Sequence, residues 1–147
     1  NIESASINGV SFSGDFMVND NFVITVSCNY LRGKTKNNTP LAHIPPFNAK
    51  MSLNYQLPRH IFSFYAHYNG WKVAKDYDLA GVDNLEEATI DGSPSWHTLN
   101  LSYTNKIDKN IHFTLGLKNI LDYHYKTFGS GLSASGRNFV VGLNANF

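Results

Sequence analysis

Histidine and tyrosine are the side chains in this 147-residue chain most suited to holding a metal-containing ligand. The run Tyr123-His124-Tyr125 places together two residue types that can bind haem iron. Only His43 and His124, of the six histidines, fall in long connections between the patterned segments described below. A contribution of these two side chains to ligand capture is therefore a hypothesis, and a structural role for the tyrosines is the alternative.

An acidic stretch between residues 76 and 87 resembles a calcium-binding loop. Asp76, Asp78, Gly81 and Glu87 occupy positions 1, 3, 6 and 12 of that pattern. Ala80 stands at position 5, where Asp or Asn is expected, and no helical pattern flanks the stretch. We interpret these residues as an acidic, solvated loop and predict no metal site.

Enzymatic chemistry is not indicated. The chain lacks a nucleophile elbow, a paired HxxxH, a phosphate-binding loop and a dinucleotide fingerprint. The single cysteine, Cys28, excludes an internal disulfide and any zinc site built from several cysteines. We therefore expect neither an enzyme nor a bound cofactor.

The composition departs from that of an ordinary soluble domain. Charged residues make up 16% of the chain, below the roughly 25% that is usual. Aromatic residues make up 14%, and Asn occurs 18 times. The formal net charge of +1 gives no basic field that would attract nucleic acid. No apolar run is long enough to predict a transmembrane helix.

Alternation of apolar and polar residues with a period of two runs through most of the chain and predicts β-strands. In residues 110–118, for example, Ile111, Phe113 and Leu115 alternate with His112 and Thr114. Near Gly9 the phase changes, which predicts a β-bulge. The pattern predicts about seven antiparallel strands of about 9 to 12 residues, close to the length that crosses a bilayer. They fall at residues 10–18, 22–30, 49–57, 62–69, 96–104, 110–118 and 138–147.

The connections alternate between short and long. Residues 18–21, 57–60 and 105–110 form short turns, whereas 33–46, 72–95 and 121–137 form long connections. Short turns on one side and long loops on the other are typical of outer-membrane barrels. Apolar residues and the aromatic residues on their face would then point to lipid, and Asn, Ser and Thr to a wet interior.

Four sequence motifs in a fixed order resemble the C-terminal barrel portion of TonB-dependent outer-membrane receptors. They are residues 5–10 (ASINGV), 40–46 (PLAHIPP), 116–125 (GLKNILDYHY) and 135–139 (SGRNF). Ser135 replaces the proline that is usual in the last motif. The resemblance covers nearly the whole chain. The sequence from residues 91–96 onward resembles most the receptors for haem and haemoglobin, which makes haem the first substrate implied and a siderophore the second.

The resemblance implies an all-β fold in which residues 1–147 are the C-terminal segment of a larger barrel, with the plug and remaining strands elsewhere in the receptor. It implies an outer-membrane protein of a Gram-negative bacterium that imports a nutrient, such as an iron compound. The implied partners are outer-membrane lipid, the rest of the barrel and plug, TonB through an N-terminal region, and the barrel-assembly machinery.

Two sets of residues carry the expected roles. Gly142, Ala145 and Phe147 match a C-terminal insertion signal, although Val140 stands where a polar residue is usual. The candidate residues facing a ligand from the outer loops are His43, Trp71, Tyr77, His124 and Tyr125. The alternative is a stand-alone soluble β-sandwich that binds a ligand or carbohydrate, in which the apolar faces of the strands would form a core.

Overall fold

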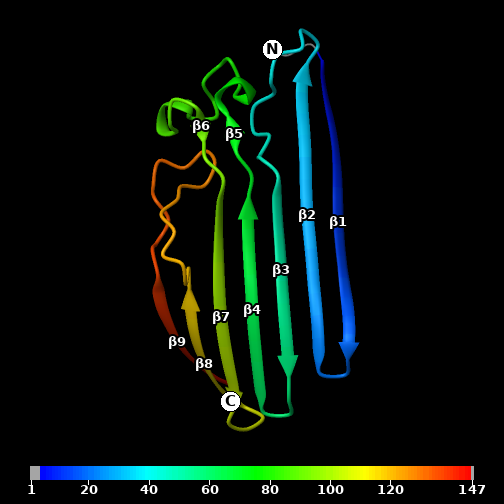
Figure 1. The fold of residues 1–147 in the computed structure, drawn as a ribbon, viewed down its shortest axis with the longest axis vertical. Coiled ribbons are helices and arrows are strands. Elements are labelled where there is room, and N and C mark those ends of the chain that lie inside the picture. The colour runs from blue at the N-terminus through cyan, green and yellow to red at the C-terminus, as the bar shows by residue number, and fades with distance from the viewer. Residues whose placement is uncertain (1–3, 147) are drawn as a thin grey trace.

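The computed structural model describes residues 4–146 and consists of one large antiparallel sheet with loops at one end (Figure 1). Its seven strands are ordered β1-β2-β3-β4-β7-β8-β9. They are β1 (Ala5–Asn19), β2 (Phe22–Thr35), β3 (Asn48–Gln56), β4 (His60–Asn69), β7 (Trp96–Lys106), β8 (Ile111–Lys118) and β9 (Asn138–Ala145). A two-stranded ribbon, β5 (Lys72–Val73) with β6 (Gly92–Ser93), and the 3-10 turns η1 (Ala74–Asp76) and η2 (Leu85–Glu87) lie in one loop.

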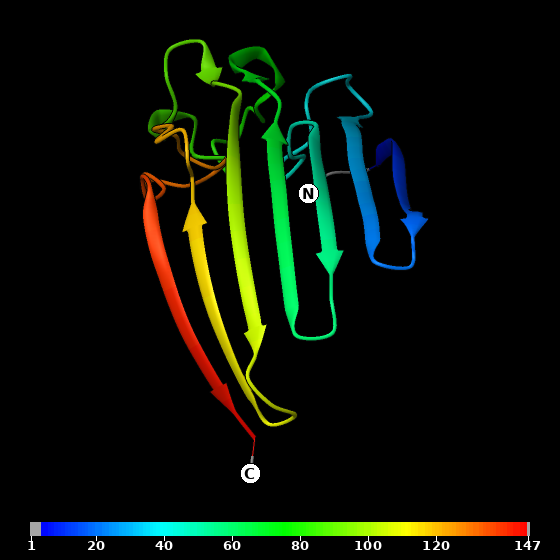
Figure 2. The same cartoon turned by 60° about the horizontal axis from the view of Figure 1, so that its bottom comes forward.

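Short turns and long loops occupy opposite ends of the sheet (Figures 1 and 2). Two of the three short turns use a side chain to satisfy backbone donors. Asn19 Oδ1 accepts from Asn21 N at 2.9 Å, and Asp108 Oδ1 accepts from Asn110 N at 2.7 Å and Ile111 N at 2.9 Å. The predicted sorting of connections by length is confirmed.

The strand register sorts side chains by face, because residues that pair across antiparallel strands point the same way. Pairing joins Phe22 to Tyr55, Tyr55 to Phe62, and Phe62 to Tyr103, so all four lie on one face. In the same way the opposite face carries Lys50 beside His67, and His67 beside Thr98. The predicted alternation of an apolar and a polar face is confirmed.

Within the part of the chain that the structure describes, no second layer covers the apolar face. Among residues 4–146 the only buried large apolar side chain is Tyr77, which lies in the loops. A β-sandwich needs two packed sheets with a shared core, and the other sheet here has only two short strands. The structure therefore does not support the sandwich alternative.

The predicted bulge near Gly9 is wrong. Pairing of β1 with β2 continues without interruption from Ala5 to Met17, and the irregularity lies between Met17 and Asn19, at the turn. The change of phase reflects which residue types occupy the two faces of β1 and not an extra residue in the strand. Ile7 lies on the otherwise polar face and Val10 on the apolar face, without an inserted residue between them.

Candidate functional site

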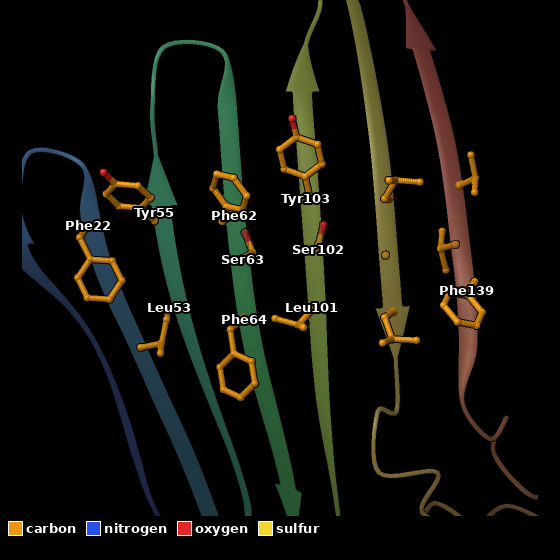
Figure 3. A pocket seen from close by; sticks show the side chains of 15 residues that line it. Phe22, Leu53, Tyr55, Phe62, Ser63, Phe64, Leu101, Ser102, Tyr103 and Phe139 are labelled. Carbon is orange, nitrogen blue, oxygen red and sulfur yellow. The ribbon is translucent and has the colours of Figure 1, made fainter.

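The apolar face forms a continuous surface across six strands. A second row runs parallel to the aromatic one and contains Leu53, Phe64, Leu101 and Leu117. These rows line a shallow hollow of about 590 Å³ that extends to Phe139 on β9 (Figure 3). Such a broad exposed apolar area marks a surface that meets lipid or another protein rather than water.

Aromatic side chains concentrate at two heights on this face. Near the short turns, the Phe62 and Tyr103 rings lie 5.0 Å apart, and Tyr103 Oη lies 2.9 Å from His60 Nδ1. Near the long loops, the Tyr68 ring lies 6.1 Å from that of Phe47. Phe62 and Tyr68 are six positions apart on β4, which corresponds to about 20 Å along the strand at ~3.3 Å per residue. In membrane barrels aromatic girdles flank an apolar band of about 25 Å, and the spacing here is of the same order.

The opposite face is polar and holds a recess of about 410 Å³ below the long loops. Its lining includes Tyr65, His67, Lys118 and Tyr125. Asn100, 5% exposed, donates from Nδ2 to Tyr65 O at 3.2 Å, and its Oδ1 accepts from Asn119 N at 2.9 Å. The buried amide is therefore satisfied, and the recess is a polar wall of the kind that faces a barrel interior.

The last long loop is closed at its base by side chains from the third and fourth sequence motifs. Asn119, at φ 49°, donates from Nδ2 to Tyr123 O at 2.9 Å and Ser135 O at 3.2 Å. Asp122 Oδ1 accepts from Arg137 N at 2.6 Å, and Arg137 Nε donates to Ile120 O at 2.9 Å. A Cβ at Gly136 would lie 2.7 Å from Asp122 Oδ1, so a larger residue there would have to displace the Asp122 carboxylate. The motifs thus serve to position this loop.

A buried ion pair joins the long loops to each other. Lys72 and Asp83 are 5% and 3% exposed, with Nζ 3.9 Å from Oδ2. Lys72 Nζ also donates to Ile44 O at 2.5 Å and lies 4.7 Å from the Phe128 ring centroid. Asp83 Oδ1 accepts from His43 N at 2.8 Å. We call His43, Ile44, Lys72, Tyr77, Asp83 and Phe128 the outer-loop cluster; its members come from all three long loops.

The electrostatics of the cluster reflect its burial. Burial lowers the pKa of Lys72 below its ordinary value, although the nearby Asp83, Asp76 and Asp78 carboxylates oppose that shift. Asp83 Oδ2 has no hydrogen-bond donor among the described residues, so Lys72 supplies its compensating charge. Burying such a pair costs desolvation energy, and the attraction between the two charges offsets that cost only in a well-defined geometry. The long loops are therefore held in a defined arrangement.

The five predicted ligand-facing residues have different environments. His43 and His124 are exposed, and Trp71 is 50% exposed with Nε1 donating to Asp91 O at 3.1 Å. Tyr125 is half-buried and stacks on Trp96 with ring centroids 4.2 Å apart. Tyr77 requires a correction. It is 3% exposed and its Oη lies 2.8 Å from Ser93 Oγ, so it packs the loops together and presents no surface to a ligand.

The acidic stretch does not assemble a cation site. Slight burial would raise the pKa of Asp78, but backbone N–H donors from Val82, Asp83 and Ala80 outweigh this effect and the pKa lies below its usual value. Glu87 instead pairs with Lys126 at 3.5 Å. Across residues 4–146, no three His, Cys, Asp or Glu side chains gather closely enough to hold a metal ion.

The residues of the predicted insertion signal lie on the last strand and beyond it. Gly142 pairs with Thr114, and Ala145 pairs with Ile111 at the end of β9. Phe147 lies outside the described residues. β9 is at one edge of the sheet and β1 at the other.

Sequence reasoning missed the Lys72–Asp83 pair. The two residues lie in a stretch without regular alternation, and although Asp83 falls within the loop of residues 76–87, no motif links it to Lys72. The nearest signal was Lys72 directly after Trp71 and Gly70, where a lysine with apolar neighbours would be expected to bury its stem.

No helix within residues 4–146 is long and apolar enough to span a membrane.

Comparisons with known proteins agree with this geometry. A family model described as TonB dependent receptor-like, beta-barrel matches residues 1–120. Among solved structures, the copper transporter OprC superposes with a TM-score of 0.82 at 19% identity, covering 97% of this chain and 24% of that one. The ferric enterobactin receptor PfeA from Pseudomonas aeruginosa gives a TM-score of 0.73 at 18% identity, covering 100% and 23%.

The P. aeruginosa receptor FpvA, bound to heterologous pyoverdines, gives a TM-score of 0.70 at 12% identity, covering 97% of this chain and 20% of that one. The chain thus spans about a quarter of the length of these structures or less. A comparison with curated protein sequences gave no match. The banded apolar face and the matched family model agree: this chain belongs to the TonB-dependent receptor β-barrel family, whose members reside in the outer membrane of Gram-negative bacteria.

Proposed function

We propose that this chain supplies barrel wall and outer loops to a TonB-dependent receptor that actively imports a nutrient across the outer membrane. The observation that carries the proposal is the seven-stranded single-layer sheet with an aromatic-banded apolar face outside and a polar face inside. Unpaired backbone groups at the edges of such a sheet cost several kcal/mol each in lipid. Further strands pairing with β1 and β9 would remove that cost, so we infer that this chain is one segment of a larger barrel enclosing a plug; the proposal that it is the C-terminal segment rests on the resemblance of its four motifs.

The proposed transport cycle is the one that membership of this family implies. Outer loops and plug capture the substrate, and energy delivered through TonB rearranges the plug so that the substrate passes. The outer-loop cluster supports the capture step, because a surface fixed before binding loses less conformational entropy when it binds. The proposed role of this segment is transport and not catalysis.

The proposed substrate is an iron compound, with haem first and a ferric siderophore second. Exposed His43 and His124 and half-buried Tyr125 provide side chains suited to such a ligand. Copper is the competing cargo, because one similar structure is a copper transporter and imidazole also binds copper. We expect cells that depend on the complete receptor to take up radiolabelled iron supplied as haem or siderophore, and to lose that uptake without TonB. Uptake of copper alone would refute the iron proposal and leave the transport proposal standing.

We also propose that Gly142, Ala145 and Phe147 act as the signal read by the barrel-assembly machinery. The edge position of β9 supports this role, since an exposed edge can be recognised by β-augmentation. Deleting Phe147 from the complete receptor should lower its outer-membrane level, whereas Phe147→Tyr, which keeps an aromatic end, should restore it. Normal insertion of the deletion variant would rule out the signal.

A further inference from the structure

The polar face of the large sheet carries positive charge and almost no negative charge. Strands β2, β3, β4, β7, β8 and β9 contain no Asp or Glu, and the single acidic residue in a strand of this sheet is Asp15 on the edge strand β1. Thr25 Oγ1 donates to Asp15 Oδ1 at 2.6 Å, so that carboxylate already has a partner within the sheet. A polar face can form without any particular sign of charge. The absence of carboxylates from six neighbouring strands is therefore a specific property of this sheet.

The basic residues of this face form two groups. Strand pairing places Lys50 beside His67 near the long loops, and Lys106 beside His112 near the short turns. Lys118 is six positions from His112 on β8, about 20 Å along the strand at ~3.3 Å per residue, so it belongs with the first pair. We call Lys50, His67 and Lys118 the loop-end basic group, and Lys106 and His112 the turn-end basic group. None of the three lysines makes an ion pair within residues 4–146.

The loop-end basic group borders the recess of about 410 Å³ below the long loops. Lys118 and His67 contribute to its lining, together with the rings of Tyr65 and Tyr125, and the described lining residues include no carboxylate. Ammonium groups form strong charge-assisted hydrogen bonds with anionic oxygens, and tyrosine rings stack on planar aromatic groups. The recess therefore suits an anion with an aromatic body.

The turn-end basic group borders a second hollow, of about 500 Å³, at the opposite end of the sheet. Arg59 and Lys109 join Lys106 and His112 in its lining, and Asp108 is the single carboxylate among the described lining residues. Asp108 Oδ1 accepts hydrogen bonds from two backbone nitrogens of its own turn, at 2.7 and 2.9 Å. The three lysine and arginine charges therefore exceed the one carboxylate charge, and the lining is positive.

Small neutral groups separate the two basic groups. Between them on β7 and β8, the positions on the polar face are Ser102, Thr104, Thr114 and Gly116. The hydroxyls of Thr104 and Thr114 lie 3.0 Å apart and satisfy each other. Sites that conduct an ion must attract it and still release it, which several weak sites achieve better than one strong site. Two basic groups joined by a neutral polar stretch meet that requirement.

We propose that the polar face guides an anionic cargo from the loop-end basic group to the turn-end basic group. This inference rests on the proposed transport function and names its substrate class, a compound that carries carboxylate or phenolate groups. Haem, with its carboxylates, and a ferric tris-catecholate complex belong to this class, whereas a bare copper ion does not. An acidic surface of the plug would be held best by one continuous cationic patch. The separation of the two groups by about 20 Å of neutral surface instead favours a cargo that moves.

The test measures uptake by cells that depend on the complete receptor. The probes are radiolabelled iron supplied as haem or as ferric tris-catecholate, and copper(II) as the cationic probe. Lys106→Gln with Lys118→Gln removes one lysine from each basic group. An exposed ion pair contributes up to about fivefold, so uptake of the anionic probes should fall by about 10- to 25-fold. Lys106→Arg with Lys118→Arg keeps both charges and should retain uptake.

The matched control is Arg32→Gln with Lys34→Gln. It removes the same charge from positions of β2 that alternate in phase with Phe22 and so point away from the polar face, and uptake should stay unchanged. Heat-modifiable migration on gels confirms that each variant is folded. An equal loss of uptake in this control would show a non-specific effect of net charge and overturn the inference.

The remaining outcomes separate this inference from the transport function. Undiminished uptake of the anionic probes by the Lys106→Gln and Lys118→Gln variant would overturn the inference and leave the transport function standing. Entry of vancomycin into cells with this variant would show a displaced plug and assign the lysines to plug docking. TonB-dependent uptake of copper alone by the unchanged receptor would exclude an anionic cargo. Absence of TonB-dependent uptake of every probe would overturn the proposed function and this inference together.

Discussion

Replacing Asp83 by Asn tests whether the buried ion pair holds the long loops together. Asp83 Oδ2 and Lys72 Nζ are 3.9 Å apart and almost fully buried. At an effective dielectric constant of about 20, two unit charges at this distance attract by about 4 kcal/mol. Removing one partner of such a pair costs about 3 to 5 kcal/mol, because the other charge stays buried without compensation. We expect the closed arrangement of the loops to lose about 3 kcal/mol.

This loss should appear as local opening and not as collapse of the sheet. The hydrogen bond from His43 N to Asp83 ties the first long loop to the second, so amide exchange near His43 reports directly on the cluster. Hydrogen–deuterium exchange of the complete receptor should show these amides exchanging about a hundred times faster in the variant. Amides in the middle of β4 and β7 should keep their rates, because the ladder between those strands does not involve the cluster.

Glu87→Gln provides the matched control. It removes an acidic charge from the same long loop, but its partner Lys126 lies 3.5 Å away with both side chains well exposed. Exposed pairs contribute at most about 1 kcal/mol, so exchange near His43 should change less than twofold. Combining Asp83→Asn with Lys72→Met should cost less than the sum of the single changes if the two charges interact. Equal effects of the Asp83 and Glu87 variants, or additive costs in the double variant, would refute the reasoning.

Three further predictions concern the cluster, a motif residue and the membrane face. The pKa of Lys72 is lowered in the closed loops, so between that pKa and the ordinary lysine value the closed loops bind fewer protons than the open loops and become more stable as the pH rises. Proteolysis of the long loops by an alkaline protease should therefore slow as the pH rises through this window. Lys72→Met should abolish this pH dependence. Asn119→Ala should lower the free energy of unfolding by about 2 to 4 kcal/mol, because two side-chain hydrogen bonds are lost and alanine is strained at this positive φ. Heat-modifiable gel migration measures this loss. Asn119→Gly should lose only the free energy contributed by the hydrogen bonds. Leu101→Arg on the lipid face should cost about 2 to 4 kcal/mol in a folding assay in lipid vesicles, and Ser102→Arg on the polar face should cost little; similar costs would contradict the assigned faces.

The sheet could be predicted from sequence because its signal is local. Period-two alternation and turn residues indicate where most strands lie and how they pair, and each connection of two to four residues fixes its own hairpin register. The sheet holds two failures of prediction. The bulge near Gly9 is wrong, and β1 (Ala5–Asn19) and β2 (Phe22–Thr35) extend beyond the predicted 10–18 and 22–30. Both occur where these strands run past the apolar band and apolar and polar residues no longer alternate.

The long loops could not be predicted in the same way. Their structure depends on contacts between residues such as Lys72 and Ile44, which are 28 positions apart, and Asp83 and His43, which are 40 apart. No periodic pattern encodes such contacts. The same limit explains the correction at Tyr77: a tyrosine in an outer loop looked available to a ligand, but the ribbon of β5 and β6 buries it against Ser93 and Phe128.

The sheet and the long loops differ in what stabilises them. The sheet buries no apolar core of its own, so its apolar face requires lipid and its edges require further strands. The loops instead contain their own buried polar network, with Lys72, Asp83 and Asn119 each held by contacts within the described chain. A change in the membrane environment should therefore destabilise the seven-stranded sheet first. A change in the outer-loop cluster should instead alter the arrangement of the long loops while the sheet stays intact. Loops of different sequence can be carried by one kind of sheet, because the contacts that arrange the loops lie within the loops themselves.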